Sequence, residues 1–264
     1  MRIDQLLVER GLASSRSQAQ RLVASGVRWQ GPNGWRTAAK NGDEVPADAA
    51  IELLDAAEAR YVSRGGLKLE GALRTARVDV TGRVCLDVGQ STGGFTDCLL
   101  HHGAAHVVGV DVGHAQLHAR LRGDPRVTCV EGVNARDPDA LKVIADFDHL
   151  MGTDGQFNSK FDLITGDVSF ISSTLVLPAV VPHLKPGGTL LWLVKPQFEL
   201  QPHQIGKGGI VKDAALYTEV AQRLHSCCAG LGLQVQQWFD SPITGGDGNR
   251  EFFMDATHGN GSPA

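Results

Sequence analysis

The sequence predicts an α/β fold in which helices cover both faces of a mostly parallel sheet, preceded by a small α+β module. From Arg83 onward, apolar segments of strand length alternate with segments of helical periodicity, and such alternation builds parallel sheets. Glycine accounts for 32 of 264 residues, as expected for many tight strand-to-helix turns. The first 40 residues instead show two helical patterns and a hairpin pattern. We therefore expect two domains of different architecture.

The N-terminal module is expected to open with two short helices. Apolar residues recur at helical spacing over residues 3–10, which predicts the first helix. Ser15 and Gln18 have the spacing of a capping box, and Gly26 predicts the end of the second helix. Residues 27–35 then predict a β-hairpin around a Gly-Pro-Asn-Gly turn.

Charge is segregated along the chain. Residues 1–40 carry seven Lys or Arg against two acids, residues 41–58 carry six acids and no base, and residues 60–77 carry five bases against one acid. The net charge of −4 argues against a uniformly basic nucleic-acid-binding surface. Two local basic stretches remain available for an anionic partner.

The predicted domain boundaries follow from a change in composition after residue 58. The segment RYVSRGG, residues 60–66, combines charge with paired glycines and leads into a helix with apolar residues at helical spacing. We expect a small N-terminal domain over 1–58, a linker over 59–66 and the α/β domain over 67–264. Within the α/β domain, the first strands are expected over 84–88, 106–112 and 126–132, and the intervening helices over 96–103 and 114–121. The polar stretch 146–160 is expected to be an inserted surface loop before the fourth strand.

The loop LDVGQSTGGFTDCL, residues 86–99, joins the first strand of the α/β domain to its first helix. Its glycines do not fit G-x-G-x-x-G, so the dinucleotide fingerprint is absent. Such a turn lets the backbone approach a methionine moiety, with Asp87 placed to meet its ammonium group, although another nucleotide remains an alternative. Asp111, at the end of the second strand, is placed to bind two ribose hydroxyls, and Asn134 to reach an adenine amino group. The predicted residues for binding S-adenosylmethionine are Asp87, Gly89, Ser91, Gly93, Gly94, Phe95, Asp111, Val112 and Asn134.

Four polar residues at the edges of apolar segments are the candidate catalytic residues: Lys68, Asp167, Lys195 and Glu251. Lys195 directly follows an apolar run, so it is expected at the carboxyl end of a buried strand, where ligands bind in open α/β sheets. A ribose hydroxyl is a very weak acid, so a lysine held neutral by burial could accept its proton while the two acids orient the lysines. For each residue taken singly, a structural ion pair is the alternative. Phe170 and Phe198 are placed to stack on a displaced base, or they belong to the core.

The first 58 residues resemble the S4 RNA-binding domain, on the stretch RIDQLLVERGLASSRSQAQRLVASGVRWQG. The resemblance implies that the second helix and the following strand face structured RNA. It predicts RNA contacts, mainly to phosphates, by Arg16, Gln20, Arg21 and Arg28, and we add Arg64 from the linker. The alternative is a solvated basic face on a small structural module.

Nearly the whole chain resembles the TlyA family, in which an S4 domain precedes an FtsJ-like methyltransferase domain. The blocks that carry this resemblance are YVSRGGLKL, LDVGQSTGGFTDCLL, VVGVDVGHAQL, DVSFIS, LVKPQFE, GKGGIVKD and SPITGGDGNREF. It implies a Rossmann-like class I methyltransferase fold with a mostly parallel seven-stranded sheet, S-adenosylmethionine as cofactor, and a Lys-Asp-Lys-Glu tetrad formed by the four candidates above. Gln90 departs from the family pattern, in which a small residue is usual in the cofactor loop.

The same resemblance implies methylation of a cytidine 2′-hydroxyl in ribosomal RNA, free or within a ribosomal subunit. Because the S4-like pattern starts at Arg2, we expect the form of the family that acts on the large subunit (23S), with 16S as a further possibility. Two alternatives stay open: a membrane-active haemolysin, after the family's historical label, and a non-catalytic RNA-binding protein. With no apolar run long enough to span a bilayer and no metal-ligand spacing among ten histidines, we expect no membrane partner, no metal and a cytoplasmic location.

Overall fold

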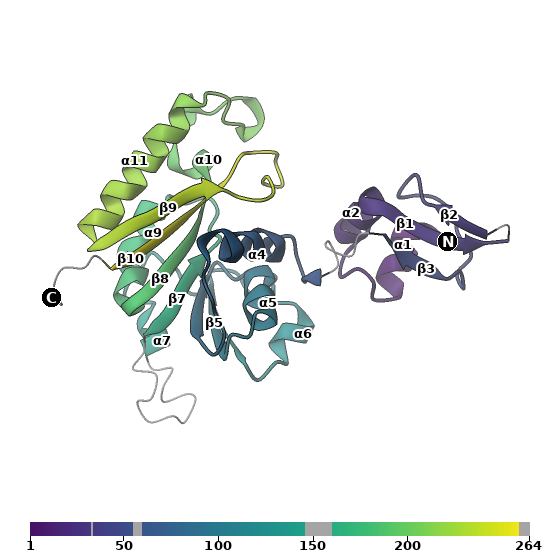
Figure 1. Cartoon of the computed structure of the whole chain (residues 1–264), viewed down its shortest axis with the longest axis horizontal. Coiled ribbons are helices and arrows are strands. Elements are labelled where there is room, and N and C mark those ends of the chain that lie inside the picture. Colours follow the sequence, from purple (N-terminus) through teal and green to yellow (C-terminus); the bar gives the residue numbers. More distant parts are fainter. Residues whose placement is uncertain (33, 55–59, 146–159, 259–264) are drawn as a thin grey trace. The chain divides into compact units, whose positions relative to one another are not determined.

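The computed structural model describes residues 1–32, 34–54, 60–145 and 160–258, and it divides into two compact units, Met1–Leu67 and Lys68–Ala264 (Figure 1). The described part of the expected linker, residues 60–66, is grouped with the first unit. The expected inserted loop lies outside the described residues, except for Lys160.

The first unit is an α+β module, as expected. Its two helices are α1 (Ile3–Glu9) and α2 (Arg16–Gly26), followed by the strands β1 (Val27–Gly31), β2 (Gly34–Thr37) and β3 (Ile51–Leu53). The strands form an antiparallel sheet in the order β2-β1-β3, which confirms the predicted hairpin. Its core contains apolar residues from both helices and the central strand: Ile3, Leu6, Leu7, Ala19, Leu22, Val23, Val27 and Trp29. A small apolar core of its own supports the unit.

The start of α2 shows half of the predicted capping box. The Ser15 side chain accepts a hydrogen bond from the Gln18 backbone N–H at 3.2 Å. The Gln18 side chain, however, accepts from the backbone N–H of Ser14 at 2.6 Å, and its amide donates to the Tyr61 carbonyl at 3.1 Å. Gln18 is buried, so its amide has to satisfy both its donor and its acceptor within the protein. It thereby ties the segment around Tyr61 to α2.

The second unit holds a seven-stranded, mostly parallel sheet in the order β6-β5-β4-β7-β8-β10-β9. Its strands are β4 (Val84–Val88), β5 (His106–Asp111), β6 (Val127–Glu131), β7 (Phe161–Gly166), β8 (Leu184–Val194), β9 (Leu233–Asp240) and β10 (Phe252–His258). The strands β6, β5, β4, β7 and β8 run parallel, and β10 pairs antiparallel with both β8 and β9. The predicted fold class is therefore confirmed.

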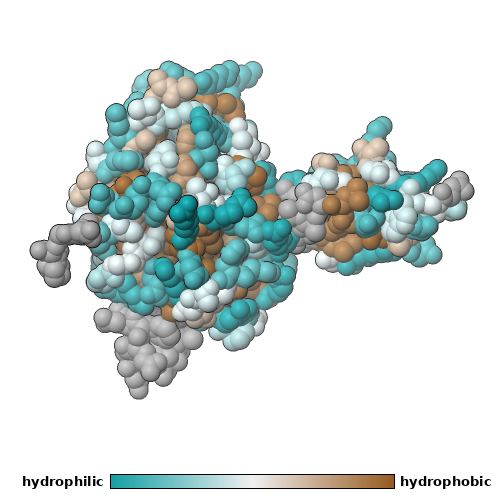
Figure 2. All heavy atoms as spheres, in the orientation of Figure 1, coloured by the Kyte–Doolittle hydropathy of each residue, from teal (hydrophilic) through white to brown (hydrophobic). Residues whose placement is uncertain are grey.

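Helices cover both faces of this sheet (Figure 1). They are α4 (Gly65–Ala76), α5 (Gly94–His101), α6 (Ala119–Arg122), α7 (Lys142–Ala145), α9 (Ser173–Val180), α10 (Pro196–Glu199) and α11 (Ala215–Gly230), with short 3-10 turns at Val181–His183, Pro202–Gln204 and Lys207–Gly209. Buried residues of α9 and α11 join the core on one face of the sheet. On the other face, Phe95 of α5 stacks on Phe253 of β10. The visible surface of this unit is mainly hydrophilic, with small hydrophobic areas (Figure 2).

One predicted helix is much shorter than expected. The helical pattern over 114–121 yields only α6, and the preceding residues form an irregular loop. Ala115 has a positive φ of 55°, which does not fit an α-helix, and its N–H donates to Glu131 at 2.9 Å. The N–H of Gly113 turns back to the Asp111 carboxylate at 2.7 Å. Local side-chain to backbone hydrogen bonds thus replace the first helical turn.

Candidate active site

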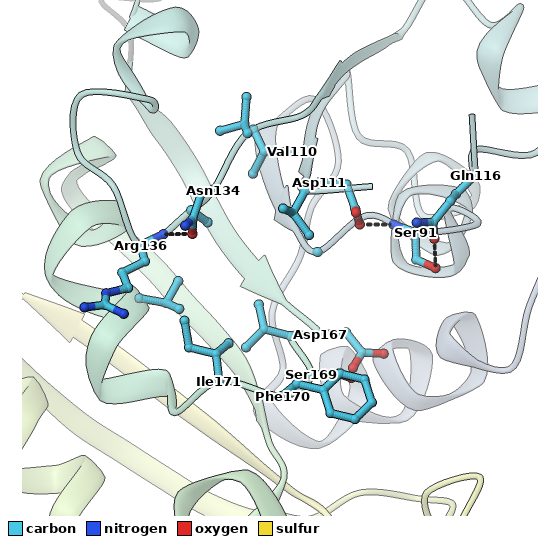
Figure 3. Close-up of a pocket in the computed structure, with 16 residues that line it drawn as sticks. Ser91, Val110, Asp111, Gln116, Asn134, Arg136, Asp167, Ser169, Phe170 and Ile171 are labelled. Atoms are coloured by element: carbon cyan, nitrogen blue, oxygen red, sulfur yellow. Dashed lines mark hydrogen bonds between the residues drawn. The ribbon is translucent and has the colours of Figure 1, made fainter. Parts of the chain in front are cut away.

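The carboxyl ends of the parallel strands meet at one edge of the sheet, and the loops that follow them enclose a cavity of about 370 Å³. Its lining comes from four loops, those after β4, β5, β6 and β7. The residues are Gly89, Ser91, Val110, Asp111, Val112, Gln116, Val133, Asn134, Ala135, Arg136, Asp167, Val168, Ser169, Phe170, Ile171 and Val176. Figure 3 shows Asp111 and Ser91 on one side of this cavity, with Asp167 and Phe170 opposite.

The loop after β4 passes close to the loop after β7. Gly89 has a φ of +79°, and a Cβ atom at this position would lie 2.8 Å from the carbonyl oxygen of Asp167. Only glycine fits there, because both the backbone conformation and the missing space exclude a side chain. The close approach brings the cofactor loop next to a candidate catalytic residue.

Asp111 joins two loops at the rim of the cavity. One carboxylate oxygen accepts from the Ser91 N–H and the other from the Gly113 N–H, each at 2.7 Å. A carboxylate has about four acceptor sites, so lone pairs remain for a ligand. Gln116 accepts from the Ser91 hydroxyl at 3.2 Å and so bridges the same two loops (Figure 3).

The predicted cofactor-binding residues fall into two groups. Gly89, Ser91, Asp111, Val112 and Asn134 line the cavity, whereas Asp87, Gly93, Gly94 and Phe95 are buried behind it. Gly93 has a φ of +93°, and a Cβ atom there would lie 2.4 Å from a side-chain carbon of Leu121, so it serves packing at the start of α5. The contact of all nine residues with the cofactor stays a prediction.

Asp87 is buried, with 1% of its surface exposed. One carboxylate oxygen accepts from the N–H and hydroxyl of Thr96, at 3.0 and 2.7 Å, while the other has no hydrogen-bond partner among the described residues. Burial raises the pKa of Asp87 to about 7, with smaller contributions from the charges of Asp167 and Asp111, against the Thr96 hydrogen bonds. A positive group next to its free oxygen would favour the ionised form.

The four candidate catalytic residues form two ion pairs. Lys195 Nζ lies 2.5 Å from Asp167 Oδ1, and Lys68 Nζ lies 2.5 Å from Glu251 Oε2. Asp167 lines the cavity, and Lys195 also donates to the Ser169 hydroxyl at 2.7 Å. The side chains of Lys68 and Glu251 are only 10% and 3% exposed. Burial raises the pKa of Glu251, although the charges of both lysines oppose the shift.

Close packing of α4 places Lys68 in this cluster. A Cβ atom on Gly71 would lie 2.6 Å from the ring of Pro242, so the helix and the segment between β9 and β10 approach closely. Glu251 directly precedes β10, where its carboxylate can pair with Lys68. The charges of Lys195 and Asp167 also act on the pKa of Glu251, so the second ion pair is coupled electrostatically to the first.

The sequence patterns did not single out several cavity residues. Gln116 falls in the pattern that predicted a helix, so its place beside Asp111 had no sequence signal. Ser169 lies two residues after Asp167 and would have been found only by asking what else accepts from Lys195. Arg136 also lines the cavity, and its N–H donates to Asn134 at 3.1 Å.

Comparison with known proteins identifies the family. The FtsJ-like methyltransferase family matches residues 61–257, and the S4 domain family matches residues 1–26. The 16S/23S rRNA (cytidine-2′-O)-methyltransferase TlyA of Mycobacterium tuberculosis is 41% identical over 96% of this chain and 88% of its own length. The chain belongs to the TlyA family.

Two other relatives of this TlyA-family chain bear on its function. The 23S rRNA (cytidine-2′-O)-methyltransferase TlyA of Campylobacter jejuni is 33% identical over 76% of this chain and 72% of its own length. A solved structure named "Putative hemolysin from Streptococcus thermophilus" is 38% identical and has a TM-score of 0.70, covering 98% of this chain and 89% of that one. Both names current in the family, methyltransferase and haemolysin, are thus present among its relatives.

The predicted RNA-binding residues of the S4 unit lie on its second helix and first strand, except for Arg64. Arg16, Gln20 and Arg21 belong to α2, and Arg28 belongs to β1. Arg16 pairs with the buried Asp4 at 3.1 Å, and the neighbouring arginines hold the pKa of Asp4 at about 2, with Arg2 contributing most. Arg28 lies 3.4 Å from Glu52 and over the ring of Trp35. Their contact with RNA stays a prediction.

In the part of the chain that the structure describes, no helix is both long enough and apolar enough to cross a membrane. Among the same residues, no three or more His, Cys, Asp or Glu side chains are grouped as they would be around a metal ion.

Proposed function

We propose that this TlyA-family chain transfers a methyl group from S-adenosylmethionine to the 2′-hydroxyl of a cytidine in 23S ribosomal RNA. The observation that carries the proposal is the Lys195–Asp167 pair at the rim of a cavity whose other rim bears Asp111. The relatives support the substrate, because 23S rRNA and cytidine occur in the names of both TlyA enzymes cited above.

The cavity fits S-adenosylmethionine in size and chemistry. Its volume falls within the range of about 300–1,000 Å³ that is usual for small-molecule sites. Asp111 offers acceptor sites for ribose hydroxyls, Asn134 offers a side-chain amide, and Val110, Val133 and Ile171 supply apolar walls. S-adenosylmethionine supplies the electrophilic methyl group.

Lys195 is the group that meets the attacking hydroxyl. It would accept the 2′-hydroxyl proton on Nζ as the oxygen takes the methyl group and the sulfonium cofactor leaves as a neutral thioether. Asp167 Oδ1 and Ser169 Oγ lie 2.5 and 2.7 Å from Nζ and hold the ammonium that forms. Lys68 and Glu251 form a second, more buried ion pair, and the charges of Lys195 and Asp167 act on its carboxylate.

Two aromatic rings beside Lys195 are placed for the target base. Phe170 is 90% exposed and has a positive φ of 64°, an unfavourable conformation for a bulky residue. Its ring centroid lies 5.0 Å from that of Phe198, whose ring lies 6.0 Å from Lys195 Nζ. An exposed ring next to the proton acceptor suits stacking on a base displaced from its helix.

The test is methyl transfer from labelled S-adenosylmethionine to purified large subunits, small subunits and naked rRNA, followed by nucleoside analysis. Wild type is expected to yield labelled 2′-O-methylcytidine in 23S rRNA, and Lys195→Ala is expected to yield none while binding the cofactor normally. Lys185→Ala is the matched control, because Lys185 pairs with Asp162 at 2.8 Å across the same two strands, at the opposite end from Lys195.

Three results would change the proposal. Label in 16S rRNA alone would overturn the choice of subunit RNA. Binding of RNA without any transfer by wild type would favour a non-catalytic RNA-binding protein. If wild type causes liposomes to leak and Lys195→Ala causes the same leakage, the result would favour the haemolysin.

A further inference from the structure

The segment after β7, residues 167–172, meets the segment after β8, residues 195–200, at three successive places. Lys195 contacts Asp167 and Ser169, as described above. The rings of Phe198 and Phe170 pack together. The third meeting point involves Glu199, a residue that the proposed chemistry does not use. We call these two segments the β7 loop and the β8 loop.

Glu199 is a buried carboxylate, 3% exposed, that binds the end of the β7 loop. Its Oε2 accepts from the Ser172 hydroxyl at 2.5 Å, and its Oε1 accepts from the Ser173 N–H at 2.7 Å. Among the described residues, no Lys, Arg or His forms an ion pair with it. Burying a carboxylate without a cation is costly, and strong hydrogen bonds to both oxygens offset that cost.

These contacts determine the direction of the Ser172 hydroxyl. Ser172 caps α9 by accepting from the Thr174 N–H at 3.2 Å. A hydroxyl has one proton and two lone pairs, so the proton given to Glu199 leaves the lone pairs for the cap. Glu199 therefore fixes the point at which the β7 loop ends and α9 begins.

Trp192 holds the same loop from β8. Its indole N–H donates to the Ser173 hydroxyl at 3.0 Å. Its ring also lies against Gly166, where a Cβ atom would be 2.4 Å from the ring. The loop is thus held on both sides, at Gly166, the last residue of β7, and at Ser172 and Ser173, where the loop ends and α9 begins. Between these anchors lie Asp167 and the strained Phe170.

We propose that Glu199 is a positioning residue for methyl transfer. It holds the β7 loop against the β8 loop so that Asp167 and Ser169 stay within hydrogen-bonding distance of Lys195 Nζ. This inference rests on the proposed function, because it concerns the geometry of the same proton acceptor. Glu199 itself contacts neither the cofactor nor the RNA.

The test compares wild type, Glu199→Gln and Glu219→Gln as full-length proteins. Glutamine keeps the size of Glu199 but replaces one acceptor oxygen with a donor. We expect the single-turnover rate at saturating S-adenosylmethionine and rRNA to fall about tenfold or more in E199Q, with the cofactor Kd changed less than about threefold, because misplacing reactive groups lowers the rate more than ground-state binding. Glu219, a half-exposed carboxylate on α11, is the matched control. It pairs with Arg223, which also donates to the backbone carbonyl of Glu199, but its carboxylate binds Arg223 and Gln204 rather than the β7 loop, so E219Q is expected to leave both quantities unchanged.

A second variant keeps the inference testable if E199Q folds poorly. Ser172→Ala removes only the hydroxyl, and we expect it to lower the rate with the cofactor Kd preserved. If Glu199 acts through Ser172, the double variant is as slow as E199Q rather than the product of both effects. Amide hydrogen exchange at Ser173 is expected to be faster in E199Q than in E219Q.

The outcomes separate this inference from the proposed function. No transfer by wild type to any rRNA overturns the proposed function and the inference with it. Transfer by wild type that folded E199Q and S172A match within twofold overturns the inference alone. A fall in cofactor affinity as large as the fall in rate also overturns it, because Glu199 would then shape the cofactor cavity.

Discussion

Replacing Asp87 by asparagine should remove a pH-dependent loss of stability from the methyltransferase unit. Asp87 lies on β4 with 1% of its surface exposed, and one of its carboxylate oxygens has no hydrogen-bond partner in the described structure. Its pKa is raised from 3.8 to about 7, chiefly by burial. Asparagine has nearly the same shape, keeps an acceptor for Thr96, and does not ionise.

The size of the effect follows from the two pKa values. Because the folded protein binds the proton of Asp87 more tightly than the unfolded chain does, its contribution to stability is fully present below pH 3.8 and is lost as the pH rises to about 7. The shift of about 3 units, at about 1.4 kcal/mol per unit, corresponds to about 4 kcal/mol. Over this window wild type should lose stability relative to D87N by about 1.4 kcal/mol per pH unit.

Urea unfolding of both proteins at pH 5, 6, 7 and 8 measures this difference. Asp240→Asn is the control, because Arg250 lowers the pKa of Asp240 below 3.8, so its contribution is fully present at all four pH values and its difference from wild type should stay constant. Parallel pH profiles of wild type and D87N would refute the reasoning. Repeating the series with saturating S-adenosylmethionine tests the predicted ammonium contact, since a nearby positive charge would lower the pKa of Asp87 and flatten the wild-type slope.

Three further results are expected. Asp111→Ala should weaken cofactor binding about 10- to 100-fold in calorimetry, because hydrogen bonds to a charged acceptor contribute about 1.5–3 kcal/mol. Gly166→Ala should destabilise the protein by about 1–3 kcal/mol in urea, since its methyl group would overlap the buried Trp192 ring. Arg28→Ala should lower the salt dependence of rRNA binding by roughly one phosphate contact, as measured by filter binding at several salt concentrations.

The fold could be predicted because local patterns and tertiary packing agree over most of the chain. The buried strands of the second unit are continuous apolar runs, as parallel strands require, and each ends near a polar residue at the same edge. The pattern misled where tertiary contacts replaced helical ones. Residues 114–118 have helical periodicity, but the N–H of Ala115 donates to Glu131 instead. Just before them, the N–H of Gly113 donates to Asp111, and α6 begins only at Ala119.

The site was predictable at the ends of strands and less so within loops. Asp111, Lys195 and Asp167 directly follow or end apolar strands, so topology alone brings them to one edge. The depth of Asp87 was not predictable, because strand alternation does not tell which polar residue faces the cavity and which lies behind the loop. Glu199 was hidden for a different reason, since its partners lie 26 and 27 residues away and share no periodic pattern with it.

The two ion pairs of the tetrad are not equivalent, and their burial assigns them different tasks. The Lys195–Asp167 pair borders the cavity and can exchange its proton with a substrate, whereas the Lys68–Glu251 pair is almost completely buried. A buried pair contributes little net stability, because desolvation cancels much of the attraction, so its value lies in where it places charge. Once Lys195 has accepted the substrate proton, the four groups together carry two positive and two negative charges. Methyl transfer moves one proton onto Lys195, and Glu251 lies close enough for its charge to respond to both lysines.

Removing Lys68 would leave Glu251 buried without its nearest cation and raise its pKa further. A carboxyl that binds its proton more tightly would present less negative charge to the neighbouring Lys195.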